Sequence, residues 1–153
     1  MKQSSVLPND KLQAGDAAVK GLFNGFIAGI GMAIVLVAAG LVGGVPAAST
    51  FERFTPISGG GPLAGVLAHL AVSGIYGMIF GLLWSTVLRW VRVDSGAWQG
   101  VLAGAAYGLL LWLVAQFVLL PTTGAALGSM PAGQFLFAHL VYGLVLGWLF
   151  GRG

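Results

Sequence analysis

The chain has 153 residues, of which 58% are hydrophobic and only 7% are charged, and its mean hydropathy is +0.94. A soluble domain carries roughly 25% charged residues, so this inventory cannot cover a water-exposed surface. The composition therefore predicts an integral membrane protein. The absence of cysteine excludes disulfides and thiolate chemistry, and the net charge of +3 comes from scattered cations that do not indicate nucleic-acid binding.

Four apolar segments follow a polar N-terminal tail, residues 1–20. A bilayer core of about 30 Å needs about 20 apolar residues per helix, and the segments meet this requirement four times. The predicted spans are residues 21–45, 63–88, 97–119 and 134–150. Together they form one predicted membrane domain, residues 21–153. The connection 121–133 contains two prolines and many small residues, so we expect it to be compact rather than helical.

Basic residues divide the connections into two sides. Six of them lie in the N-terminal tail, the second connection and the C-terminus: Lys2, Lys11, Lys20, Arg89, Arg92 and Arg152. Only Arg53 lies on the opposite side, next to Glu52. Under the positive-inside rule this asymmetry predicts a bacterial inner-membrane protein with both termini in the cytoplasm.

The chain also contains an internal repeat. Gly21, Gly25 and Gly29 recur 75 residues later as Gly96, Gly100 and Gly104, and Ala68-His69-Leu70 recurs 70 residues later as Ala138-His139-Leu140. Repeat one covers residues 21–90 and repeat two covers residues 96–153. Because each repeat contains two spans, both copies insert in the same orientation. The predicted fold is all-α, with four transmembrane helices arranged as two parallel two-helix repeats about a pseudo-two-fold axis along the membrane normal.

Small residues recur at every fourth position of each span. Such ridges let helix backbones approach closely in lipid, where dispersion contacts replace the hydrophobic effect. The predicted helix-packing residues are Gly25, Gly29, Ser73, Gly77, Gly81, Gly100, Gly104, Gly143 and Gly147. The ridges predict a tightly packed bundle, and the alternative is that they leave room for a planar cofactor or a partner helix.

His69 and His139 head two of these ridges and lie at matching depths in the second and fourth spans. An ionisable side chain at such a depth suggests a functional site. Three interpretations are open. The imidazoles make interhelical hydrogen bonds, or they ligate haem b or a chlorophyll-type pigment, or they line a proton or small-solute pathway. A haem shared between them would be excluded if the second and fourth spans touched through their glycines.

No motif for hydrolysis or phosphate binding is present, and two histidines without carboxylate or thiolate ligands are an incomplete zinc site. We therefore expect no enzyme. The leading hypothesis is a non-catalytic accessory or scaffold subunit of a larger respiratory or photosynthetic membrane complex, without a cofactor. Its partners would be lipids and other membrane subunits or a second copy. The alternatives are a b-type cytochrome-like or pigment-binding electron-transfer subunit that uses His69 and His139, and a small-solute or proton conductor.

Overall fold

The computed structural model describes residues 14–55, 60–91, 96–123 and 130–152, and this part of the chain contains helices and no strand. The elements are α1 (Ala14–Val42), α2 (Ala47–Glu52), α3 (Gly61–Val91), α4 (Ala97–Val114), the π-helical turn η1 (Ala115–Leu119), α5 (Leu120–Thr123) and α6 (Ala132–Gly151). Four helices are long and apolar enough to cross a membrane, with η1 completing the third of them. The predicted all-α fold with four spans is confirmed.

The ends of the helices differ from the predicted spans in two places. α1 begins at Ala14, so Asp16 and Lys20 belong to the first helix and not to a separate tail. At the other end of the bundle, the helix that follows α4 continues to Thr123, although a non-helical connection was expected from Pro121 onward. Residues 1–13, which include Lys2 and Lys11, lie outside the described residues, and so does Arg92.

The turn η1 explains how a helix continues through Pro121. The amide of Leu120 donates to the carbonyl of Ala115, five residues earlier, instead of four. Proline has no amide hydrogen and its ring collides with the preceding turn of a regular helix, so a widened turn relieves the conflict. Ala115 and Leu119 in the widened turn, and Leu120 next to it, line a cavity of the bundle.

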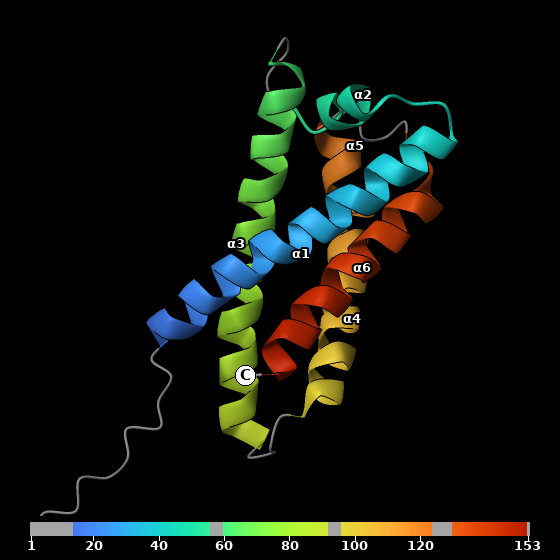
Figure 1. The fold of residues 1–153 in the computed structure, drawn as a ribbon. Coiled ribbons are helices and arrows are strands. Elements are labelled where there is room, and N and C mark those ends of the chain that lie inside the picture. The colour runs from blue at the N-terminus through green and yellow to red at the C-terminus, as the bar shows by residue number, and fades with distance from the viewer. Residues whose placement is uncertain (1–13, 56–59, 92–95, 124–129, 153) are drawn as a thin grey trace, which may run out of the picture.

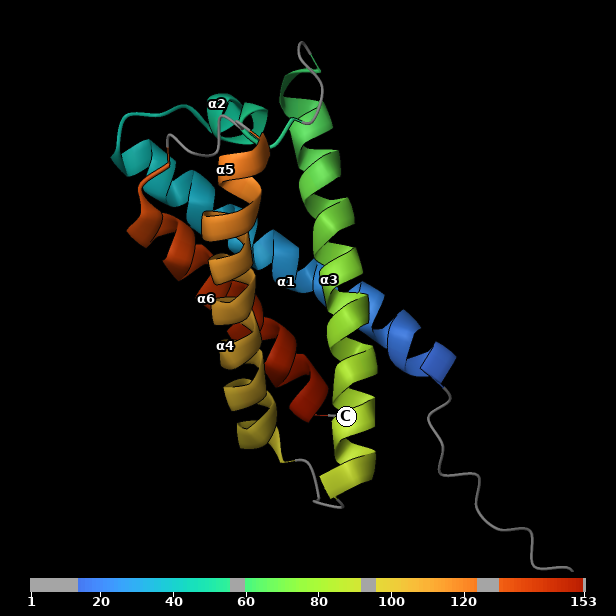
Figure 2. The ribbon, with the colours of Figure 1, turned by 180° about the vertical axis from the view of Figure 1, so that it is seen from behind.

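The helices form two hairpins. α1 packs against α3 in the first hairpin, and α4 packs against α6 in the second. Figures 1 and 2 show α1 and α6 side by side as an inclined pair, with α3 and α4 standing more upright behind them. The short helix α2 folds over the end of the bundle and packs against α3, which identifies one end as the α2 end.

Small residues make the contact within each hairpin. A methyl group at Gly25 would collide with the carbonyl oxygen of Ser73, and one at Gly77 would collide with Gly21 and Gly25. In the second hairpin a methyl group at Gly104 would collide with the carbonyl oxygen of Gly143. The glycines therefore bring the first span against the second, and the third against the fourth.

The two hairpins pack in different registers. Gly25 and Gly100 occupy the same place in the repeat, as do Gly77 and Gly147. Gly100 lies against the carbonyl of Gly147, whereas Gly25 lies against the carbonyl of Ser73, four residues before Gly77. The second hairpin is thus shifted by about one helical turn relative to the first. The pseudo-two-fold axis stays a prediction, and the packing departs from it by this shift.

The two contacts between the hairpins, α1 with α6 and α3 with α4, also differ from each other. α1 packs along α6, whereas α3 and α4, which occupy the corresponding places in the repeat, are bridged by side chains. An aromatic cluster fills the space between α3, α4 and α6 on the side away from α2. Its ring centroids are 5.1 Å apart for Phe80 and Tyr107 and 5.3 Å apart for Phe80 and Phe150. Edge and tilted contacts of this kind are favourable between aromatic rings.

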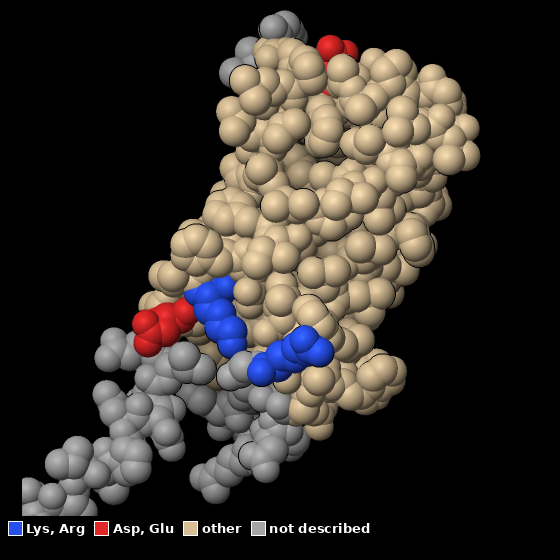
Figure 3. Space-filling view, viewed as in Figure 1, with Lys and Arg blue, Asp and Glu red and all other residues tan. Residues whose placement is uncertain are grey.

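Charged residues avoid the middle of the bundle. Figure 3 shows charged side chains at the two ends of this face and none between them. The ammonium of Lys20 lies 5.3 Å from the ring centroid of Phe150, and the guanidinium carbon of Arg152 lies 3.9 Å from that of Trp148. These cation–π contacts keep the apolar stems of the side chains on the bundle while the charges stay at its end.

The glycine contacts make a specific stability prediction. Gly104→Ala should lower the free energy of unfolding by about 1–3 kcal/mol, the usual cost of overpacking, because the added methyl group meets the backbone of α6. The matched control is Gly133→Ala, since no atom lies within 4 Å of a methyl group there. Thermal unfolding in mild detergent measures both. Equal melting temperatures for the two variants would contradict the packing described here.

Candidate functional site

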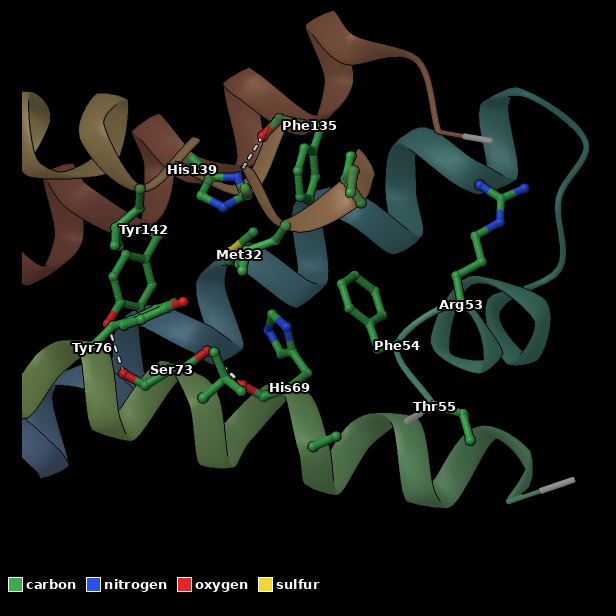
Figure 4. A pocket seen from close by; sticks show the side chains of 16 residues that line it. Met32, Arg53, Phe54, Thr55, His69, Ser73, Tyr76, Phe135, His139 and Tyr142 are labelled. Carbon is green, nitrogen blue, oxygen red and sulfur yellow. Dashed lines mark hydrogen bonds between the residues drawn. The ribbon is translucent and has the colours of Figure 1, made fainter. Parts of the chain in front are cut away.

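A cavity of about 400 Å³ lies between the two hairpins at the α2 end of the bundle (Figure 4). Most of its polar groups come from α3 and α6. The segment after α2 covers it and adds Arg53 and Thr55, and η1 forms part of its wall. Its main lining residues are Met32, Arg53, Phe54, His69, Ser73, Tyr76, Leu111, Ala115, Leu119, Phe135, His139 and Tyr142. The cavity occupies the space that the unequal contact of the hairpins leaves between α3 and the α4–η1 helix.

Helical spacing places the polar residues on two facing surfaces. His69, Ser73 and Tyr76 follow one another at intervals of four and three residues on α3, so they share one face of that helix. His139 and Tyr142 have the same interval of three residues on α6. The structure brings these two faces together around the same cavity, as Figure 4 shows.

The His69 imidazole makes an interhelical hydrogen bond. Its Nε2 lies 3.0 Å from the carbonyl oxygen of Gly29 on α1. A carbonyl only accepts hydrogen bonds, so Nε2 carries the hydrogen and donates it. The Ser73 hydroxyl donates to the carbonyl of His69 at 2.7 Å. The Phe54 ring contacts the imidazole at a centroid distance of 5.1 Å, with the two planes tilted by 58°. Of the three interpretations left open by the sequence, this geometry corresponds to the interhelical hydrogen bond.

The His139 imidazole is held within its own helix. Its Nδ1 donates to the carbonyl oxygen of Phe135 at 2.8 Å. The other nitrogen, Nε2, makes no hydrogen bond to a described residue, and Figure 4 shows it directed toward the interior of the cavity. Phe135 supports the ring edge-on at a centroid distance of 4.4 Å. The two histidines thus present different nitrogens, although both belong to the same repeated triplet.

Two tyrosines connect the hairpins across this region. The Tyr142 hydroxyl donates to the carbonyl of Ser73 at 2.7 Å, and the Tyr107 hydroxyl donates to the carbonyl of Tyr76 at 2.9 Å. Tyr76 itself makes no side-chain hydrogen bond to a described residue, and its hydroxyl extends into the cavity (Figure 4). These two hydrogen bonds are not among the contacts predicted from the sequence. The available signal was that all three tyrosines of the chain lie within predicted spans, where a hydroxyl needs a polar partner.

The cavity opens toward the apolar surroundings of the bundle. Val72 on α3 and Leu119 in η1 both line it, and they are 47% and 40% exposed. Both residues belong to predicted spans, so this part of the cavity wall is exposed to lipid. The aromatic cluster around Phe80 and Tyr107 packs the region on the other side of Tyr76.

The geometry of the two imidazoles bears on the hypothesis that His69 and His139 together ligate haem or a pigment. Both histidines line one cavity, but Nε2 of His69 is engaged by Gly29 and would have to release that hydrogen bond to bind an iron. The Nδ1–H of His139 is held by a carbonyl and its Nε2 has no described protein partner, an arrangement usual for a histidine that ligates a metal. Among the described residues there is no group of three or more histidine, aspartate or glutamate side chains that could hold a metal ion.

The fold and the cavity define a class: a four-span helical membrane protein with a ligand-sized cavity between two glycine-packed hairpins. The chain belongs to the family of unknown function DUF6789, which it matches over residues 15–153. The match covers both hairpins and every residue of the cavity. No curated protein and no solved structure is significantly similar to the chain.

The tyrosine bridge makes a prediction about the joining of the hairpins. Tyr142→Phe removes the hydrogen bond to Ser73, so we expect a loss of about 0.6 kcal/mol of stability, the average for a hydrogen bond between membrane helices. Tyr76→Phe serves as the control because it removes a hydroxyl that has no described protein partner. Unfolding in a detergent titration compares the two. An equal loss in both variants would show that the Tyr142 hydrogen bond does not join the hairpins.

Proposed function

We propose that the protein is a non-catalytic membrane protein that holds a small lipid-soluble ligand between its two hairpins. The observation that carries this proposal is the Nε2 atom of His139, a hydrogen-bond acceptor without a described protein partner, directed into a lipid-facing cavity. A polar atom that faces an apolar cavity wall and lacks a hydrogen-bond partner is energetically costly. A ligand that pairs with this nitrogen removes that cost.

The cavity has the general character of a ligand site. Its volume of about 400 Å³ falls within the range of roughly 300–1,000 Å³ usual for small-molecule pockets. Its walls are mainly aromatic and aliphatic, with a small number of polar groups from facing helices. Such a combination lets apolar contacts provide affinity while the polar groups fix the orientation of the ligand.

We further propose that this binding serves a larger membrane assembly, with the protein as an accessory subunit. Most described residues lie within the four span-forming helices, so contacts with other proteins would be made chiefly by helix surfaces. We place the protein in a bacterial inner membrane with both termini in the cytoplasm. The support for this orientation is the excess of basic residues on the side opposite α2.

A second candidate is a haem- or pigment-binding subunit. The observation that favours it is the geometry of His139, whose Nδ1–H bond to Phe135 leaves Nε2 available as an axial ligand. The structure favours ligation through this one histidine over the bis-histidine arrangement, because His69 already uses its Nε2.

The binding proposal is tested by analysing what the protein carries from its own membrane. We expect solvent extraction and mass spectrometry of the purified protein to release a non-phospholipid small molecule in near-stoichiometric amount. Ala115→Phe narrows the cavity and should abolish this retention. The control is Leu113→Phe. Leu113 lies in the same continuous helix, is 40% exposed and does not line the cavity, so this variant should still retain the small molecule.

The same samples separate the two candidates. A Soret band that shifts on dithionite reduction and disappears in His139→Ala would establish the haem candidate. Absence of any small molecule from the unaltered protein, or equal retention by Ala115→Phe and Leu113→Phe, would refute binding in this cavity.

A further inference from the structure

We infer that the ligand of this cavity is a lipid-soluble hydroquinone, a ring with two hydroxyl groups and an apolar tail, which donates one hydroxyl to Nε2 of His139. This inference rests on the proposed function, because it names the chemical class that the cavity would hold. It is carried by the hydrogen-bonding state of His139, by the Tyr76 hydroxyl and by the aromatic walls around them.

The hydrogen bond made by Nδ1 of His139 determines which kind of ligand group can pair with Nε2. Nδ1 donates its hydrogen to the carbonyl of Phe135, so Nε2 of the neutral ring offers a lone pair. Among the described residues that line the cavity there is no carboxylate that could stabilise a protonated imidazole. The matching ligand group is therefore a hydrogen-bond donor. A quinone carbonyl, a ketone or an ether would place a second lone pair against the first.

A second polar group that lines the cavity, the Tyr76 hydroxyl, can pair with a second oxygen of the ligand. The Tyr76 hydroxyl extends into the cavity and has no described hydrogen-bond partner. A hydroxyl both donates and accepts, so it pairs with a second ligand oxygen while His139 accepts from the first. The Ser73 hydroxyl is not available for this purpose because it already donates to the carbonyl of His69.

The apolar walls favour an aromatic ring over an aliphatic alcohol. Phe54, Phe135 and Tyr142 line the cavity together with Met32, whose thioether is shown between the two histidines in Figure 4. Aromatic rings and sulfur both make favourable contacts with a further ring. The cavity wall at Val72 and Leu119 is exposed to lipid, so a tail attached to the ring can extend among lipid chains.

The test uses four probes with the same decyl tail: a decyl hydroquinone, its dimethyl ether, the corresponding benzoquinone and the carboxylic acid of equal chain length. Binding to the full chain in detergent is measured anaerobically by calorimetry. We expect the hydroquinone to bind at least tenfold more tightly than the dimethyl ether and the quinone. A tenfold difference is 1.4 kcal/mol, within the range for leaving one buried polar group unpaired.

Two variants place this preference at His139. His139→Phe should bring the ratio of hydroquinone to dimethyl-ether affinity to about one, and His139→Gln, whose amide oxygen can accept, should restore part of it. Because the two affinities are compared within a single variant, the ratio does not depend on the fraction of protein that folds. Leu113→Phe, which lies outside the cavity lining, is the control and should keep the preference.

The outcomes separate the inference from the function on which it rests. Equal binding of the hydroquinone and its dimethyl ether, or tighter binding of the carboxylic acid, would overturn the hydroquinone assignment. The proposed function would still stand if the extracted small molecule is retained by the unaltered protein and lost in Ala115→Phe. Failure of all four probes, together with absence of an extractable molecule, would overturn both.

Discussion

Close contact between backbones within each hairpin is the constraint on which the rest of this structure depends. In lipid no hydrophobic force draws helices together, so association depends on packing at short range. Gly25 and Gly77 provide that packing in the first hairpin, and Gly104 and Gly143 provide it in the second. Because the helices cross at these points, their tilt determines which helices meet along their length and which leave space between them.

The register of each crossing decides what the repeated histidines do. A shift of about one turn places His69 near the carbonyl of Gly29 in the first hairpin, whereas the backbone of His139 lies against Gly108 in the second. His69 therefore donates across the helices, and His139 donates to its own preceding turn. Two identical residues thereby acquire different roles: one stabilises a hairpin, and the other presents an acceptor to a cavity.

The unequal contact between hairpins explains the position of the cavity. α1 and α6 pack together along their length, while the corresponding pair, α3 and α4, is held by the Tyr107 hydrogen bond and by the aromatic cluster at one end only. Toward α2 the widened turn at Ala115–Leu119 forms part of the wall. π-Helical turns are frequent at functional sites because they redirect side chains within an otherwise regular helix. Here that turn lines the proposed site.

The sequence by itself determined the class of fold, because a chain with so few charged residues must satisfy its backbone hydrogen bonds internally and therefore crosses lipid as helices. It also identified His69 and His139 as buried polar residues in two of the spans. Only the tertiary structure decided which spans touch, since glycines at every fourth position fit several partners equally well. The difference between the two histidines, the tyrosine bridges and the cavity follow from crossings between residues far apart in the chain, which no local pattern specifies.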